Sequence, residues 1–407
     1  MCPERLAAVD PTANEKDRIE AWQADLDTLT RELPKRHKNA FFKTKIEKFL
    51  EAADEVRKKI PELKDHQILV EFVKLAALLG DEHTEVGPGS DSTPFRRYPL
   101  ALVWLKDGLY VAAAEEKHKD LLRFRIVAVD DCPLDKVLAR LAPLSASATE
   151  SGAKQAALYW LLSAEALHAL GVVEDMEKAR FSAVNEKGSK LTVELAPAPP
   201  KGETNLAYAI DPQSKDLAPS RRLPRDRYGQ SWLEEPKTLY WWYDSCADLP
   251  DRPVKQWCEQ VLGEIDQRKP ERVVIDLRRN GGGSSPLIKP LIDGLRERED
   301  ANQKGKLFVL IGRRTFSSAM MNALEFRERT NAVLLGLPTG GSPNHFGEVR
   351  SFTLPHSKWQ VFYSTKRFQL TDDGATTVKP DMEVDESAAD FFAGRDAVLD
   401  AAVKYKP

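Results

Sequence analysis

The stretch Leu307-Phe308-Val309-Leu310-Ile311-Gly312 is apolar, and Thr315-Phe316-Ser317-Ser318-Ala319 follows it after two arginines. The next residues, 320–326, have the composition of a helix. The sequence therefore predicts a buried strand that turns into a helix at Ser317. A hydroxyl at such a turn would lie at the positive end of the helix dipole, where negative charge is stabilised.

A second loop of the same kind lies upstream, in Asp276-Leu277-Arg278-Arg279-Asn280-Gly281-Gly282-Gly283. Glycine permits positive φ and a close approach of the backbone to a substrate. A serine nucleophile needs a base and preorganised donors for the oxyanion. The two loops together predict acyl transfer, with Ser317 as the nucleophile and the N–H groups of Gly281, Gly282, Gly283 and Ser318 as oxyanion donors. A plain helix cap and a plain turn would account for the same residues equally well.

Strands and helices alternate in the last third of the chain. The predicted strands are 273–277, 307–311 and 333–336, with helices near 285–299 and 317–329. Repeated strand–helix–strand units imply a parallel sheet with ligands at the carboxyl ends of its strands. Both loops described above follow such ends.

The whole chain predicts a multidomain α/β protein with three parts. Residues 1–92 carry three apolar stripes with helical spacing, the first interrupted at Pro34, which predicts a helical domain. Residues 93–200 alternate short strands and helices, which predicts an α+β module. Residues 201–407 open with a proline-rich connection and hold the αβ domain. Other predicted elements are helices over about 153–170 and 388–404 and β-rich segments over 350–354 and 359–363.

Composition excludes several classes of function. The 407 residues carry a formal net charge of −3, with lysine and arginine spread along the chain, so the whole chain offers no footprint for nucleic acid. No apolar run is long enough to span a bilayer, and the first residues lack the apolar core of a signal peptide. Taken literally this predicts a cytoplasmic protein. Export or lipid anchoring through Cys2 is the alternative, if a leader was removed.

Cysteine and histidine spacing argues against a metal centre. The four cysteines are Cys2, Cys132, Cys246 and Cys258, and no pair has zinc-like spacing. We expect no structural metal and no organic cofactor. Cys246 and Cys258 are expected to be buried free thiols, with a disulfide between them as the alternative in an exported protein.

Four strings together resemble the serine peptidase family that contains the C-terminal processing proteases, tricorn protease and the interphotoreceptor retinoid-binding repeats. They are Val274–Gly283, Thr315–Ala319, Gly336-Leu337-Pro338-Thr339-Gly340-Gly341 and Asp81-Glu82-His83-Thr84. Their order and spacing fit the family, and the similarity covers essentially the whole chain. The resemblance implies a PDZ-like middle module and a ClpP/crotonase-like catalytic domain. It also implies hydrolysis of peptides or unfolded protein segments by Ser317, which stands where the family has its nucleophile.

This sequence differs from the processing proteases at the position of the catalytic base. Those enzymes pair the serine with a lysine, and this chain has Ser342 at that place. The resemblance to tricorn protease then implies His83 as the base, with Asp373 as the orienting carboxylate; a helix-end histidine satisfied by a carbonyl is the alternative for His83. His345 is the competing base. Glu82 and Glu348 are the competing carboxylates.

Two other functions remain open from the sequence. One is a catalytically inactive protein on the same scaffold that binds a peptide or an apolar ligand, as the retinoid-binding relatives imply. The other is a CoA-ester enzyme on the related crotonase-like sheet, which leaves Ser317 without a role.

Overall fold

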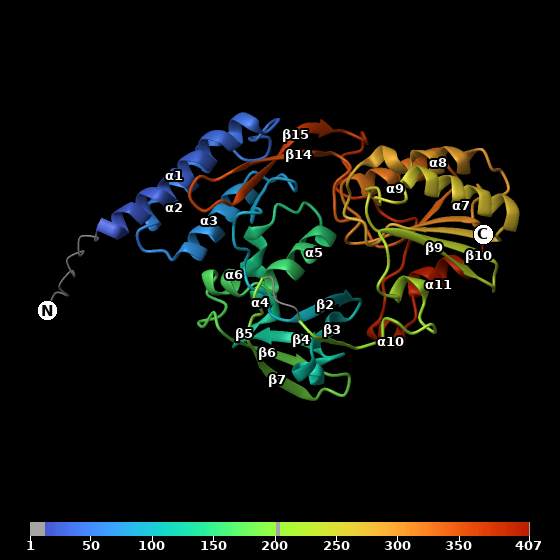
Figure 1. The fold of residues 1–407 in the computed structure, drawn as a ribbon, viewed down its shortest axis with the longest axis horizontal. Helices are drawn as coiled ribbons and strands as arrows, with labels where there is room; N and C mark the ends of the chain where they lie inside the picture. Colours follow the sequence, from blue (N-terminus) through green and yellow to red (C-terminus); the bar gives the residue numbers. More distant parts are fainter. Residues whose placement is uncertain (1–12, 201–203, 407) are drawn as a thin grey trace. The chain divides into compact units, whose positions relative to one another are not determined.

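The computed structural model describes residues 13–200 and 204–406, and the chain divides into two compact units. The first, here the helical unit, comprises the residues up to Pro94 together with Phe346–Lys366. The second, here the sheet unit, comprises Phe95–His345 and the chain from Arg367 onward (Figure 1). The fold is a multidomain mixed α/β fold with several sheets. The division into 1–92, 93–200 and 201–407 stays a prediction, and Cys2 lies outside the described residues.

Three helices form the core of the helical unit, as the apolar stripes predict. They are α1 (Ala13–Arg36), α2 (Ile46–Lys59) and α3 (Asp65–Ala77). The stripe of α1 is buried at Trp22, Leu26, Leu29 and Leu33. Pro34 lies inside α1 instead of interrupting it. It stands in the last turn, where a missing N–H removes only one helical hydrogen bond.

A long hairpin completes the helical unit from the far end of the sequence. Its strands are β14 (His345–Thr353) and β15 (Gln360–Phe368), and β1 (Glu85–Gly87) pairs antiparallel with β15 (Figure 1). The carboxylate of Asp25 on α1, which is fully buried, accepts the backbone N–H groups of His356 (2.6 Å) and Ser357 (2.8 Å) at the hairpin turn. The turn is therefore fixed to the first helix.

The sheet unit begins with an antiparallel sheet in the order β2-β3-β4-β6-β7. The strands are β2 (Leu100–Leu105), β3 (Gly108–Glu115), β4 (Arg125–Val129), β6 (Ala179–Val184) and β7 (Lys190–Leu195), with the short β5 (Cys132–Pro133) and β8 (Leu206–Tyr208) at its sides. Its helices are α4 (Leu134–Leu141), α5 (Glu150–Leu161) and α6 (Ala164–Ala169). The single helix predicted over 153–170 is thus two helices, because Ser163 caps a new start by accepting the Ala166 N–H.

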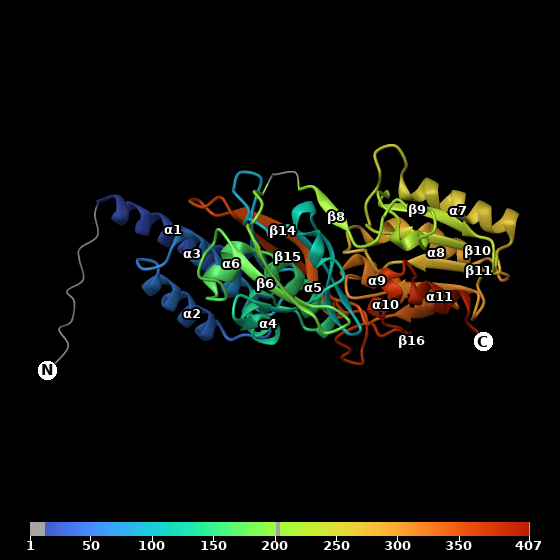
Figure 2. The same ribbon diagram turned by 90° about the horizontal axis from the view of Figure 1, so that it is seen from below.

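A six-stranded sheet in the order β16-β13-β12-β11-β10-β9 carries the last third of the chain. The strands are β9 (Tyr228–Leu233), β10 (Thr238–Tyr243), β11 (Arg272–Asp276), β12 (Leu307–Ile311), β13 (Val333–Gly336) and β16 (Met382–Glu383). All neighbours are parallel except the edge pair β9–β10, so the predicted parallel sheet is confirmed. Figure 2 shows β9, β10 and β11 side by side.

Alternate residues of these strands face two different helical layers. Val273, Ile275, Leu307 and Val309 pack in one core with α7 (Val254–Arg268), α8 (Lys289–Arg296) and α9 (Ser318–Arg329). Their neighbours Val274, Phe308 and Leu310 pack with α11 (Ala397–Val403) (Figure 1). The sheet is therefore buried on both faces, as its continuous apolar strands require.

The helix predicted over 388–404 is also divided. The structure has α10 (Ala388–Phe392) and α11, separated by Gly394 at a φ of 75°. Asp396 caps α11 by accepting the Val398 and Leu399 N–H groups. Among the residues that the structure describes, no helix is long and apolar enough to cross a membrane.

Candidate active site

Ser317 lies on a sharp turn between β12 and α9, as the sequence predicts. It is the residue before the helix, with φ at 50° and ψ at −126°. Only glycine adopts this conformation without strain. A serine held on a strained strand-to-helix turn is the geometry by which hydrolases expose a nucleophilic hydroxyl. The side chain is half-buried.

Hydrogen bonds within the turn and to the loop after β11 hold it. The buried hydroxyl of Thr315 donates to the Leu277 carbonyl (2.9 Å) and accepts the Gly312 N–H (2.9 Å). The Phe316 N–H donates to the carbonyl of Asn280 (3.1 Å). The loop after β11 therefore supports the loop after β12 directly.

The glycine loop touches Ser317 at Gly282. A Cβ built on Gly282, where φ is 113°, would lie 2.8 Å from the Ser317 Cβ. A Cβ on Gly283, where φ is 132°, would lie 2.3 Å from the Cys246 carbonyl oxygen, whereas one on Gly281 meets nothing within 4 Å. A side chain at Gly282 or Gly283 would therefore clash and would strain the backbone, so both positions require glycine. The glycine loop and the Ser317 turn are also in direct contact.

The predicted oxyanion donors differ in what they bind. The Gly282 N–H donates to the side-chain oxygen Oδ1 of Asn280 (2.8 Å), so this amide is engaged within the protein. The Gly282 carbonyl accepts the Cys246 N–H (3.0 Å), and the two groups of a trans peptide point in opposite directions. The Gly283 N–H therefore points away from Cys246. The Ser318 hydroxyl donates to the Gly283 carbonyl (2.6 Å), which fixes α9 to the glycine loop.

A buried ion network, which sequence reasoning missed, anchors the start of the glycine loop. Arg278 donates to Asp276 (2.6 Å) and to Asp396 (2.6 Å), and the Tyr240 hydroxyl donates to Asp276 (2.7 Å). Burial disfavours the charged form of Asp276, but Arg278 outweighs burial and holds the pKa of this carboxyl below its ordinary value. The Asp-Leu-Arg string was the signal in the sequence, but its partner on α11 was not visible there.

The loop after β13 lies against the Ser317 turn from another side. A Cβ on Gly341 would lie 2.8 Å from the Phe316 ring, and the Gly340 N–H donates to the Thr315 carbonyl (3.0 Å). The N-terminal end of α5 holds this loop, because the Thr149 hydroxyl donates to the Gly340 carbonyl (2.9 Å). Ser151 donates likewise to Pro338 (2.7 Å). The α5 helix and the Ser317 turn therefore share one loop.

His83 lies in the helical unit, in the turn between α3 and β1. The turn is organised by Asp81, which is 3% exposed and accepts hydrogen bonds from His37 Nε2 (2.9 Å), the Thr84 hydroxyl (2.6 Å), the Ser364 hydroxyl (2.6 Å) and the His83 backbone N–H (3.2 Å). Burial opposes ionisation, but these donors together hold the pKa of Asp81 below its ordinary value. The backbone of His83 is therefore fixed by a buried carboxylate that sequence reasoning did not assign to this role.

Asp373 and His345 lie in the sheet unit with Ser317. Asp373 is exposed, and its carboxylate accepts the Ala375 N–H (3.0 Å) within its own loop. That bond and the Thr371 side chain hold the pKa of Asp373 below its ordinary value. His345 is buried at the start of β14, with its ring stacked on Phe368 at 5.2 Å. The catalytic assignment of both residues stays a prediction.

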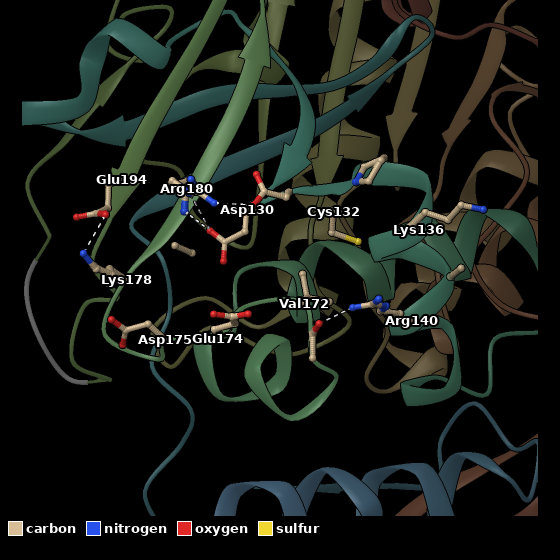
Figure 3. A pocket seen from close by; sticks show the side chains of 15 residues that line it. Asp130, Cys132, Lys136, Arg140, Val172, Glu174, Asp175, Lys178, Arg180 and Glu194 are labelled. Atoms are coloured by element: carbon tan, nitrogen blue, oxygen red, sulfur yellow. Dashed lines mark hydrogen bonds and ion pairs between the residues drawn. The ribbon is translucent and has the colours of Figure 1, made fainter.

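A cavity of about 950 Å³ lies apart from these residues, between β6, α4 and the loop after α6 (Figure 3). Its charged side chains largely pair with one another, as Lys178 does with Glu194 (3.2 Å) and Arg180 with Asp131 (3.0 Å). None of the predicted site residues lines it. The residues labelled in Figure 3 are Asp130, Cys132, Lys136, Arg140, Val172, Glu174, Asp175, Lys178, Arg180 and Glu194.

Cys246 and Cys258 are free, as predicted. Cys246 and Cys258 are buried thiols, and burial raises the pKa of Cys246 to about 11 and that of Cys258 to about 12. Within residues 13–200 and 204–406, no group of three or more histidine, cysteine or acidic side chains is arranged to hold a metal ion.

Comparison with solved structures finds the same fold over nearly the whole chain. Mature CPAF complexed with lactacystin is 13% identical, with a TM-score of 0.66 over 95% of this chain and 97% of that chain. A serine-to-alanine mutant of CPAF is 12% identical, with a TM-score of 0.65 over 97% of this chain and 99% of that chain. The photosystem II D1 C-terminal processing protease is 14% identical, with a TM-score of 0.44 over 97% of each chain. No protein-family model matches the sequence, and a search of curated proteins gave no match.

Tricorn protease is a further structural neighbour, 13% identical over 96% of this chain and 36% of that chain, with a TM-score of 0.41. The two CPAF structures share the fold of this chain. At these identities the comparison establishes the fold.

Proposed function

We propose that this protein is a serine-type peptidase that hydrolyses peptides or unfolded protein segments, with Ser317 as the nucleophile. One observation carries the proposal: Ser317 stands on a strained strand-to-helix turn against Gly282, so a hydroxyl and an unobstructed backbone meet in one place. The shared fold with CPAF, a structure of which carries a serine-to-alanine mutation, supports it. The middle part of the chain would correspond to a PDZ-like module.

The oxyanion of the tetrahedral intermediate would be held by the N–H groups of Gly283 and Ser318. Gly283 is exposed and its N–H points away from Cys246, and Ser318 opens α9, where the helix dipole is positive. Gly281, also exposed, is the alternative donor. The Gly282 N–H is the least suited of the predicted donors, because Asn280 already accepts it.

His83 is the proposed general base, and His345 is the competing candidate. The motif around His83 supports the choice, together with the four hydrogen bonds to Asp81 that hold its turn. Asp373 remains the proposed orienting carboxylate from the resemblance. We expect His83→Ala to lower kcat by about 10²–10⁴-fold, and near-normal turnover by this variant would move the assignment to His345.

A fluorophosphonate probe tests the nucleophile. The wild-type protein should be labelled at Ser317, as located by peptide mass spectrometry, and Ser317→Ala should not be labelled. Ser318→Ala is the matched control: it keeps the backbone N–H and loses the hydroxyl that binds the Gly283 carbonyl, so it should still be labelled, although more slowly. Absence of labelling in the wild type, with saturable binding of a peptide or an apolar ligand, would instead identify an inactive binding protein.

A further inference from the structure

The side chain of Asn280 has no part in the reaction proposed above, yet this buried residue contacts three segments around Ser317. Asn280 is 0% exposed. Its Nδ2 donates to the Tyr243 carbonyl at the end of β10 (2.8 Å), and its Oδ1 accepts the Gly282 N–H (2.8 Å). Its backbone carbonyl accepts the Phe316 N–H (3.1 Å). One residue therefore joins β10, the glycine loop and the Ser317 turn.

The bond from Gly282 to Asn280 determines which amides face outward. An asparagine that accepts the N–H two residues ahead forms an Asx turn, which fixes the direction of the intervening peptide groups. With the Gly282 N–H directed at Asn280 and the Gly282 carbonyl directed at the Cys246 N–H, the Gly283 N–H can point only to the other side. Asn280 thus fixes the peptide before Gly282 and the Cys246 N–H fixes the peptide after it, and the two bonds together orient the proposed oxyanion donor.

Cys246 strengthens the same arrangement. Its thiol lies 3.6 Å from Asn280 Oδ1 and 3.5 Å from the side-chain oxygen of Asn322, and its backbone carbonyl accepts the Ser284 N–H (2.7 Å). The single S–H can donate to one of these two oxygens at a time, and as a weak donor it does not displace the Gly282 N–H from Asn280 Oδ1.

We infer that Asn280 is the positioning residue of the oxyanion site: its side chain, by binding the Gly282 N–H, aims the Gly283 N–H at the carbonyl that Ser317 attacks. The inference rests on the proposed peptidase function, but it concerns a residue that touches neither substrate nor nucleophile. Without the side chain the Gly282 N–H loses its acceptor in the loop, and the bond from the Cys246 N–H to the Gly282 carbonyl alone must orient the Gly282–Gly283 peptide.

Asn280→Ala and Asn322→Ala form a matched pair of variants. Both residues are fully buried asparagines beside Cys246, and Asn322 donates to the Ser285 carbonyl (3.0 Å) instead of binding the glycine loop. We expect both to lose stability in urea denaturation. Only Asn280→Ala should lower kcat on fluorescent casein and the rate of fluorophosphonate labelling, each by about 10²-fold, with KM within about 3-fold of wild type, because displacing an oxyanion donor acts on the transition state.

Asn280→Asp separates positioning from stability. It keeps an oxygen for the Gly282 N–H but cannot donate to the Tyr243 carbonyl, so it should lose as much stability as the alanine variant and retain labelling within about 10-fold of wild type. A folded Asn280→Ala labelled at the wild-type rate, or equal losses of kcat in Asn280→Ala and Asn322→Ala, would overturn the inference. Labelling of the wild type at Ser317 is unaffected by either result, so the proposed function is tested separately.

A measurement on the unmodified protein covers the case in which no Asn280 variant folds. In ¹⁵N-glycine-labelled wild type, the fluorophosphonate adduct places an oxygen where the oxyanion would lie. The amide resonance of Gly283 should shift on adduct formation and that of Gly282 should stay in place. A shift at Gly282 without one at Gly283 would overturn the inference.

Discussion

Ser317 has the only backbone conformation in the candidate site that its own side chain disfavours. Its φ of 50° and ψ of −126° lie in a region where a Cβ is strained, at a cost of about 1–3 kcal/mol. The surrounding hydrogen bonds of Thr315 and Phe316 oppose relaxation of the turn. The strain is thus maintained at the proposed nucleophile.

Replacing Ser317 by glycine should therefore stabilise the fold and abolish turnover. Ser317→Gly relieves the strain, less the entropy that glycine adds to the unfolded chain, so we expect the sheet unit to be about 1 kcal/mol more stable than in Ser317→Ala. Ser317→Ala is the matched control, because it also lacks the hydroxyl but keeps the Cβ. Urea denaturation of both variants measures the difference, and an alanine variant as stable as the glycine variant would contradict it.

At the scale of residues, the sequence predicted the contact between the two loops but not its details. The glycine run and the serine were both recognisable, because each follows an apolar strand that had to be buried in one sheet. Asn280 and Arg278 were missed in their roles. The contact of Asn280 with Gly282 depends on the φ angles of the loop, and that of Arg278 with Asp396 depends on the position of α11. A sequence pattern contains neither.

In the helical unit, the Asp81 side chain links the turn after α1, the turn after α3 and β15. His37 belongs to the turn after α1, and Ser364 lies on β15. His37 Nδ1 accepts the Asn39 N–H (2.9 Å), so Nε2 carries the proton that it donates to Asp81. The carboxylate is therefore the acceptor for three separate segments of chain.

The contribution of Asp81 should depend on pH. Its pKa is lower in the folded protein than the ordinary value, so its stabilisation is complete above that ordinary value, near pH 4, and is lost as the pH falls through the folded pKa. We expect Asp81→Asn to lower the free energy of unfolding at pH 7 by about 2–3 kcal/mol, and the difference from wild type to shrink at pH 3. Urea denaturation at the two pH values measures this.

Asp54→Asn is the control for that experiment. Asp54 is exposed on α2, in the same unit, and its neutralisation should change stability little at either pH. A pH-independent effect of Asp81→Asn would show that packing, and not the charge of the carboxylate, stabilises the turn.

The extent of individual elements was predicted less well than their existence. Helices were expected over 153–170 and 388–404, and each is two helices in the structure. The apolar periodicity continues across both breaks, so it does not mark them. The breaks are made by local caps, Ser163 in the first case and Gly394 with Asp396 in the second.

The whole molecule has a helical unit that is discontinuous in sequence. Val86 of β1 pairs with Val361 of β15, and Asp25 and Asp81 both bind the segment 346–366. The β-rich pattern of 350–354 and 359–363 was visible in the sequence. Which part of the chain these strands would join was not, because register between distant strands is set by tertiary packing.

Removing the hairpin should therefore unfold the helical unit selectively. We expect replacement of 347–365 by a short glycine–serine linker to abolish amide-exchange protection in α1–α3. Asp25 loses the N–H groups of His356 and Ser357, Asp81 loses the Ser364 hydroxyl, and β1 loses its partner strand. Protection in β11 and β12 should remain, because their core consists of residues of the sheet unit. Hydrogen-exchange mass spectrometry gives both readings, and continued protection of α1–α3 would contradict the prediction.

Because the hairpin packs with the N-terminal helices, the helical unit can be completed only late in translation. The first helices emerge early, but the segment that covers Asp25 and Asp81 is made only after the chain has passed residue 345. At typical rates of translation the intervening chain takes on the order of tens of seconds to synthesise. During that interval Asp25 lacks its two hairpin donors, Asp81 lacks the Ser364 hydroxyl, and the helices carry an exposed apolar face. Nascent chains of this protein should therefore be recognised by chaperones that bind such faces until the hairpin is complete.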